Sequence, residues 1–313
     1  MLVGAAITVV AAGALLAWPA GPAGSPPFPE VPRPIVFAHR GGAAEGPEST
    51  LPTMLEVLRR DPRVAMELDV HRSSDGHIVV IHDDKVDRTT DGSGRVADLT
   101  LAELQTLDAG FCATPGRGRG TARGDGCRNP GPAASFPLRG KGYRIPTLDE
   151  VLQALPPDVL IGIEVKEAGF EEALAQLLRR SGRSRLVVGS ALDGVAAKLA
   201  ALLPETPRYF PRWAGLRLAA AAKLTGGRLS RPLYQVFATP RAAAGVDLAT
   251  PALLAATHRL GVLVAYFTVN DEAEMERLFR AGADAIITDY PGRARAVLDR
   301  IGRSGLRRDH PTW

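Results

Sequence analysis

The 313-residue sequence has little cysteine, few aromatic residues and no strong excess of charge of one sign. Its formal net charge is +4, and aromatic residues make up 5% of the chain. No run of Lys and Arg is interleaved with aromatics at a regular spacing, so the pattern typical of nucleic-acid binding is missing. The hydrophobic content of 45% is ordinary for a folded protein, and the length suits one large α/β barrel or two small domains.

The two cysteines, Cys112 and Cys127, enclose the segment "CATPGRGRGTARGDGC". This segment has no hydrophobic period and cannot hold itself with a core. A disulfide would close the loop in an oxidising compartment and would contribute about 3 kcal/mol on the chain-entropy model. Two unrelated free thiols are the alternative. A metal site is disfavoured, because no other Cys or His lies nearby.

Charged side chains are missing from the chain before Glu30. Residues 2–18 form an apolar run that is shorter than the roughly 20 residues of a spanning helix. The run also lacks the basic residues that begin a typical signal peptide. We therefore predict that residues 1–20 are either a cleaved export signal or a retained membrane anchor. Residues 21–34, rich in proline, are predicted to be an extended linker, and the following domain is expected in the periplasm or elsewhere outside the cytoplasm.

From residue 35 onward, apolar runs typical of strands alternate with helical stretches, which predicts a parallel sheet covered by helices. The predicted strands are 35–39, 64–70, 77–82, 159–166, 185–190, 206–210, 233–238, 261–269 and 284–288. The predicted helices lie near 50–60, 100–107, 147–155, 170–181, 193–203, 214–224, 250–259, 271–281 and 291–301. We predict a (β/α)₈ TIM barrel over residues 35–302, with a Gly/Arg-rich insertion at about 108–145 and a tail at 303–313. An open doubly wound sheet is the alternative, but its G-x-G-x-x-G loop is missing after the first strand. The link from Val70 to His77 is too short for a crossover helix, so the second and third strands should depart from the βα repeat.

Acidic side chains gather where the predicted strands end, and a barrel of this kind carries its chemistry there. Glu67 and Asp69 point to the same side of their strand, because residues two apart share a face. Glu164 lies at the end of another strand. Three carboxylates with no thiolate favour Ca²⁺ or Mg²⁺ over Zn²⁺. Ordinary salt-bridge partners are the alternative for each residue alone.

Two histidines end two other predicted strands, and beside a metal cluster they fit a general acid and a general base. They are His39 and His82, and the residues do not say which one has which role. Arg40 and Lys166 are cations that can hold a phosphate. His71 lies near the turn "HRSSDG" and is predicted to be solvated.

The motifs "HRGG…PEST", "MELDVHRSSDGHIVVIHDDKVDRTTDGSG", "IPTLDEVL", "IGIEVK", "YFTVND" and "GADAIITDYP" resemble those of the glycerophosphodiester phosphodiesterases. The resemblance runs from about residue 35 to 300. It implies a TIM barrel, with metal ligands at Glu67, Asp69 and Glu164 and catalytic histidines at His39 and His82. It also implies that Arg40 and Lys166 are the cations on the phosphate side.

The family hydrolyses glycerophosphodiesters, such as glycerophosphocholine, to glycerol 3-phosphate and an alcohol, usually with Ca²⁺ or Mg²⁺. The expected partner is therefore a small-molecule diester, and neither a nucleic acid nor a protein partner is implied.

Two residues depart from the family's motifs. Ser49 stands where Asn is common, and little effect is expected because Ser and Asn both cap helices. Either Ser49 or Thr50 is expected to cap the helix that follows. Phe267 stands where many members have Trp and is expected to line the substrate pocket.

Two other functions compete with the predicted one. The first is a phospholipase D-type enzyme that acts on lysophospholipids. The second is a catalytically inactive barrel that serves as a binding module at the membrane.

Overall fold

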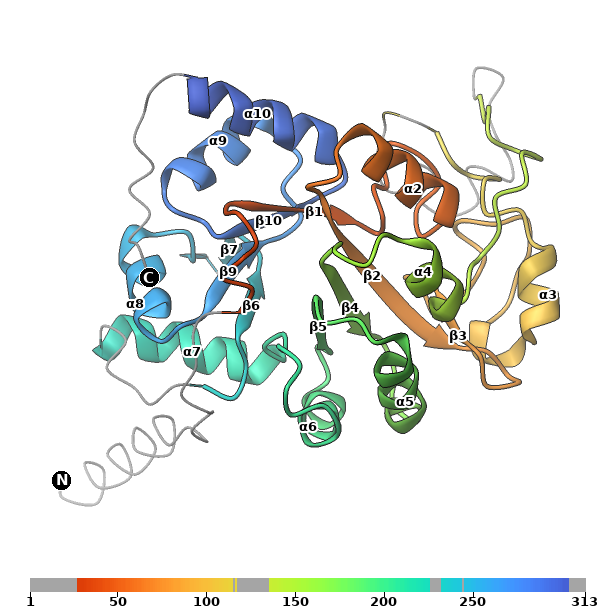
Figure 1. The fold of residues 1–313 in the computed structure, drawn as a ribbon, viewed down its shortest axis with the longest axis horizontal. Helices are drawn as coiled ribbons and strands as arrows, with labels where there is room; N and C mark the ends of the chain where they lie inside the picture. The colour runs from red at the N-terminus through yellow and green to blue at the C-terminus, as the bar shows by residue number, and fades with distance from the viewer. Residues whose placement is uncertain (1–26, 115, 117–134, 226–231, 244, 304–313) are drawn as a thin grey trace.

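The computed structural model describes residues 27–114, 116, 135–225, 232–243 and 245–303 (Figure 1). Its main sheet has the strand order β5-β4-β2-β1-β10-β9-β6, and neighbours along this path are parallel. The strands are β1 (Ile35–His39), β2 (Ala65–Arg72), β3 (Ile78–Val80), β4 (Ile161–Val165), β5 (Leu186–Gly189), β6 (Val236–Thr239), β9 (Leu263–Tyr266) and β10 (Ala285–Thr288). A separate hairpin is formed by β7 (Ala242–Ala243) and β8 (Val246–Asp247).

Helices surround these strands in Figure 1. They are α2 (Leu51–Arg60), α3 (Leu101–Thr106), α4 (Leu148–Ala154), α5 (Glu171–Ser181), α6 (Asp193–Leu202), α7 (Arg212–Thr225), α8 (Pro251–Arg259), α9 (Glu272–Arg280) and α10 (Pro291–Arg303), with a 3₁₀ turn at Val96–Asp98. Each predicted helix is present to within a few residues.

The sheet is nearly closed into the predicted barrel, with single bridge residues in place of one strand. Between β5 and β6, Arg208 pairs with Val188 and Tyr209 pairs with Val236. The predicted strand 206–210 is thus reduced to two residues. The β2–β3 connection also departs from the repeat as expected, because β3 returns antiparallel to β2. Tyr209, one of the two bridge residues, lines the cavity of the candidate site described below.

Side chains along each strand point alternately into the barrel interior and toward the helices, and this alternation positions the functional side chains. On β1, Ile35 and Phe37 belong to the apolar cluster of the barrel interior, and His39 follows at the same parity. Ala65 on β2 belongs to the same interior cluster, whereas Met66 and Leu68 pack in the layer under the helices. The interior face is therefore apolar at the amino ends of the strands and polar at their carboxyl ends.

Part of the predicted proline-rich linker packs against the barrel. Phe28 is only 7% exposed and joins the interior apolar cluster, with Val31 beside it. The Arg33 side chain forms an ion pair with Asp284, with Nη1 3.3 Å from Oδ1. Residues 27–34 thus belong to the folded domain rather than to an extended linker. The predicted signal or anchor lies outside the described residues, and none of the described helices is long and apolar enough to cross a membrane.

The predicted insertion is described at its two edges, where it is attached to the loops at the carboxyl ends of the strands. The Gly116 amide donates to Ala44 O (2.7 Å), and Tyr290 Oη donates to Gly116 O (3.0 Å). Cys112 is buried. Cys127 lies outside the described residues, so its disulfide with Cys112 stays a prediction.

The start of α2 differs from the expected capping. Thr50 occupies the N-cap position, but its side chain makes no hydrogen bond to the amides of the helix. Its Oγ1 instead donates to Pro47 O, at 2.8 Å. Ser49 has φ = 59°, in the left-handed region that non-glycine residues rarely adopt. The expectation that the side chain of Ser49 or Thr50 caps the helix is therefore wrong. The small effect expected of Ser in place of Asn stays a prediction.

Candidate active site

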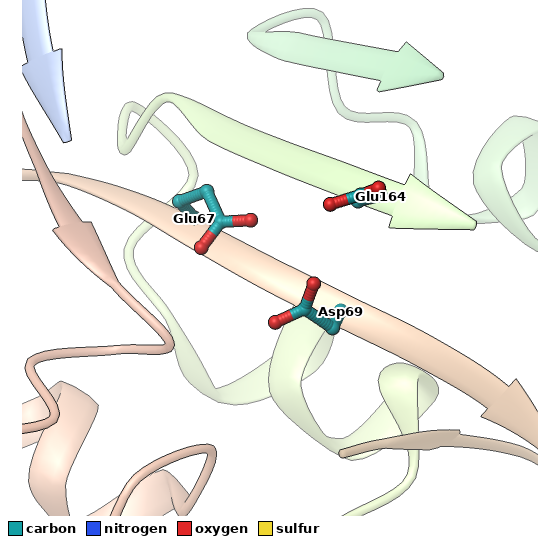
Figure 2. Close-up of side chains that lie close together, drawn as sticks. All are labelled: Glu67, Asp69 and Glu164. Atoms are coloured by element: carbon teal, nitrogen blue, oxygen red, sulfur yellow. The ribbon is translucent and has the colours of Figure 1, made fainter. Parts of the chain in front are cut away.

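Three carboxylates from two neighbouring strands converge at the carboxyl end of the barrel. Glu67 and Asp69 come from β2 and Glu164 comes from β4, and Figure 2 shows them on the two adjacent strands. Asp69 and Glu164 are register partners, which brings their side chains to the same level. One ligand oxygen from each of the three lies within 4.8 Å of the others. The i, i+2 spacing on β2 and the parallel register together create this cluster.

The cluster holds more negative charge than its protein partners neutralise. Burial, together with the nearby charges of Asp69 and Glu164, raises the pKa of Glu67 well above its ordinary value. Lys166 is the nearest cation, with its Nζ 2.8 Å from Asp69 Oδ1 and 3.0 Å from Glu164 Oε2. The buried Asp69 Oδ2 makes no hydrogen bond to any described residue. An orphaned buried carboxylate oxygen in an all-oxygen donor set fits a hard divalent cation.

Tyr209 lies beneath the cluster and was not predicted from the sequence. Gly162 on β4 makes room for it, because a Cβ at this position would collide with Tyr209 Oη. Burial, and then the charges of Glu67, Glu164 and Asp69, raise the pKa of the Tyr209 phenol well above its ordinary value. Within the described part of the chain, the buried Oη finds no hydrogen-bond partner. Tyr209 therefore offers a neutral hydroxyl to whatever the carboxylates bind.

His39 is held by an aspartate from the neighbouring strand end. Its Nδ1 lies 2.6 Å from Asp289 Oδ1, and Asn270 Nδ2 donates to Asp289 Oδ2 at 2.7 Å. When Asp289 is ionised, it accepts a hydrogen bond from the Nδ1–H of His39, and Nε2 is then the nitrogen available for proton transfer. Asn270 and Asp289 stand at strand ends in the sequence, but their connection to His39 depends on the β1–β10 pairing.

His82 has the same kind of support from a different segment. Its Nδ1 lies 2.6 Å from Asp83 Oδ1, the next residue in the chain. Arg88 Nε donates to Asp83 Oδ2 at 2.6 Å and fixes that carboxylate. The hydrogen bonds from His82 and Arg88 outweigh burial and hold the pKa of Asp83 far below its ordinary value. The two histidines thus share one arrangement, in which Nδ1 is bound to an aspartate.

Glu48 joins the His82 segment to Arg40. Its carboxylate accepts hydrogen bonds from Arg88 Nη1 and Nη2 (2.8 and 2.7 Å) and from Arg40 Nη1 (2.8 Å). Burial alone would raise the pKa of Glu48, but the two arginines outweigh it and lower the pKa to about 2. Arg40 is therefore fixed in the wall of the site, with Nε 3.9 Å from Asp69 Oδ2. Neither Glu48 nor Arg88 was among the predicted site residues.

One cavity of about 850 Å³ brings together all the residues predicted for the metal, the catalytic and the substrate sites. They are His39, Arg40, Glu67, Asp69, His82, Glu164, Lys166 and Phe267. His71, predicted to be solvated, is instead buried, and its Nε2 lies 3.2 Å from His82 O. That prediction was wrong because the ring contacts the segments that follow β3 and β4, with its Nδ1 3.5 Å from Glu167 Oε1.

The sequence profile of the glycerophosphoryl diester phosphodiesterase family matches residues 39–293. The chain belongs to this family. It is 30% identical over 272 residues to a glycerophosphodiester phosphodiesterase of Caldanaerobacter subterraneus subsp. tengcongensis, and the match covers 82% of this chain and 94% of the relative. The expected enzyme class, a phosphoric diester hydrolase, is confirmed together with the family.

Solved structures of family members show the same fold. The glycerophosphoryl diester phosphodiesterase domain of a Mycobacterium tuberculosis protein superposes with a TM-score of 0.69 at 24% identity, covering 85% of this chain and 99% of the other. A phosphodiesterase of Oleispira antarctica, solved in complex with the product sn-glycerol-3-phosphate, gives a TM-score of 0.62 at 25% identity, covering 85% and 97%. The barrel predicted from the sequence is therefore the fold of the family.

Proposed function

We propose that the protein hydrolyses glycerophosphodiesters to glycerol 3-phosphate and an alcohol, with a divalent cation and with His39 and His82 as acid and base. One observation carries the proposal. The two histidines, each bound to an aspartate through Nδ1, line the same cavity as the carboxylate cluster. The family match and the product found in the Oleispira antarctica relative support the choice of substrate.

Glu67, Asp69 and Glu164 would hold the cation, and the all-oxygen donor set favours Ca²⁺ or Mg²⁺. Such a cation supplies positive charge next to the phosphate oxygens of the diester. Arg40 and Lys166 add fixed positive charge at the same end of the cavity. These charges favour the transition state because negative charge on the phosphoryl group grows there.

The two histidines divide the proton transfers. One ring removes a proton from the attacking water molecule as the water oxygen bonds to phosphorus. The other ring donates a proton to the alcohol oxygen as the bond between that oxygen and phosphorus breaks. Asp289 and Asp83 hold the two rings so that Nε2 is the nitrogen that exchanges the proton. Overall, one water molecule is consumed, and glycerol 3-phosphate and the free alcohol are released.

The histidine variants test this proposal. We expect His39→Ala and His82→Ala each to lower the turnover of glycerophosphocholine by about 10²–10⁴-fold, the usual contribution of a positioned acid or base. A p-nitrophenyl diester should partly rescue only the variant that lacks the acid, because its leaving group needs no proton. His77→Ala is the matched control, since His77 is exposed and does not line the cavity. Near-normal rates in both variants would contradict the proposed roles of the two histidines. No turnover by the wild-type protein in the presence of Ca²⁺ or Mg²⁺ would instead favour the catalytically inactive binding barrel.

We also propose that the enzyme works outside the cytoplasm. The apolar, uncharged residues 2–18 and the two cysteines of the insertion support this placement. A peptide map of the protein from its native cell envelope, made without reductant, should contain one peptide pair joined through Cys112 and Cys127. Free thiols at both positions would count against the disulfide and against the compartment.

A further inference from the structure

The cavity is larger and more apolar than a glycerophosphodiester requires. Its volume of about 850 Å³ lies near the upper end of the range of roughly 300–1,000 Å³ for sites that hold drug-sized ligands. The catalytic residues line only its polar part. The remainder is lined chiefly by apolar side chains, among them Phe210, Pro211, Leu216, Phe237, Val246 and Leu248. Among the described residues of this second part, Arg212 alone carries a charge.

Helix α7 forms one wall of this apolar part, and small residues on it leave the space open. Gly215 lets the helix approach β6, because a Cβ there would lie 2.9 Å from the Phe237 ring. Ala219 and Ala220, about one turn later, contribute only methyl groups to the lining. The result is an apolar trough that is continuous with the catalytic part of the cavity.

The trough opens to solvent at an apolar rim, which consists of Leu216, Val246 and Phe267. These three side chains line the cavity and are nevertheless exposed, Leu216 to 49%. They make up half of the large apolar side chains that are exposed in the described part of the chain. Exposed apolar surface gathered at one place commonly marks a contact with an apolar ligand or a lipid.

We infer that the substrate is a phosphodiester that carries one long apolar chain, and that this chain lies in the trough and leaves the cavity over the rim. The inference rests on the proposed function and specifies its substrate class. The bond that breaks is unchanged: water adds across the bond between phosphorus and the alcohol oxygen, and the chain takes no part. The chain can be attached to the glycerol, as in a lysophospholipid, or to the leaving alcohol.

Kinetics with matched substrates test the inference. With Ca²⁺ or Mg²⁺ present and below the micellar concentration, kcat/KM should be at least about tenfold higher for 1-octanoyl-glycerophosphocholine or glycerophospho-octanol than for glycerophosphocholine. Preference for the first substrate would place the chain on the glycerol, and preference for the second would place it on the leaving alcohol. Equal or lower kcat/KM for both, with glycerophosphocholine still hydrolysed, would overturn the inference and leave the proposed function standing.

Two variants distinguish the effect of a charge placed in the trough from the effect of a charge added elsewhere on the surface. Leu216→Glu places a carboxylate on the path of the chain and should bring the ratio of kcat/KM for the chain-bearing and chain-free substrates close to one. Leu55→Glu is the matched control, because Leu55 is 40% exposed on helix α2 and does not line the cavity. This control should keep the ratio of the wild type. A wild-type ratio in Leu216→Glu would contradict the inference.

A binding measurement gives an answer that does not depend on turnover. Dodecylphosphocholine is a phosphodiester with one apolar chain and no glycerol. Isothermal titration below its micellar concentration should show at least about tenfold tighter binding than glycerophosphocholine to wild-type protein. The affinity should fall by at least as much in Leu216→Glu and stay unchanged in Leu55→Glu. No gain from the chain in the wild type would overturn the inference, even if the proposed hydrolysis itself failed.

Discussion

The backbone at Ser49 is held in a conformation that costs free energy. Its φ of 59° lies in the left-handed region, which an ordinary side chain disfavours by roughly 1–2 kcal/mol and which Asn tolerates better. Its buried Oγ also makes no hydrogen bond to any residue in the described ranges. A small cavity of about 10 Å³ lies beside it.

We therefore expect Ser49→Asn to raise the free energy of unfolding by about 0.5–1 kcal/mol, because Asn adopts this backbone conformation at lower cost. Urea unfolding of the two proteins at pH 7 measures the difference. Ser49→Ala is the control, since Ala has no comparable preference for the left-handed region. A destabilised Ser49→Asn protein would show that packing, rather than backbone conformation, dominates at this position.

The site residues predicted correctly from the sequence are those whose positions follow from local rules. Glu67 and Asp69 were placed together because side chains two apart on a strand share a face. Tyr209 was missed because its position beneath the carboxylates depends on Gly162, which is far from it in the chain. Glu48 and Arg88 were missed for the same reason, since their contact spans 40 residues. A charged residue at a loop carries no local signal of which distant partner it will bind.

At the scale of elements, Glu48 ties the segment before α2 to the segment that follows β3. Both of its arginine partners are largely buried, so the carboxylate contributes to stability only while it is ionised. Its pKa of about 2 in the folded protein lies below its ordinary value of 4.5. The stabilisation is therefore complete above the unfolded pKa and is lost as the pH falls from about 4.5 toward 2.

We expect wild-type protein to be more stable than Glu48→Gln at pH 7, and the gap to narrow by on the order of 2 kcal/mol at pH 3. Urea unfolding of both proteins at the two pH values measures the gap. Glu56→Gln is the matched control, because Glu56 also binds two arginines but does so on the surface, where water screens the pairs. A gap of equal size at both pH values would contradict the assigned role of Glu48.

The elements themselves were predicted well where their pattern is local and poorly where tertiary contacts decide. The α2 and α9 periods are clear, and their helices begin and end close to the predicted residues. The strand 206–210 was predicted from its apolar run, yet only Arg208 and Tyr209 pair with neighbouring strands. Phe28 was assigned to the predicted linker because prolines surround it in the sequence. Its contacts with the barrel interior are formed only in the folded structure.

For the molecule as a whole, the barrel directs apolar side chains inward at one end and charged side chains inward at the other. This arrangement gathers Glu67, Asp69 and Glu164 in a partly dehydrated site, where Lys166 is their nearest cation. Carboxylates that close together are costly without further positive charge. Hydrolysis at this cluster is therefore expected to depend on a bound divalent cation.

Turnover of glycerophosphocholine after chelation tests this dependence on a cation. We predict that protein treated with excess chelator releases no choline, and that added Ca²⁺ or Mg²⁺ restores the rate. Glu67→Gln and Asp69→Asn should stay inactive after the same addition, because each removes a carboxylate from the cluster. Full turnover in excess chelator, with no metal detected by elemental analysis of that protein, would contradict the account.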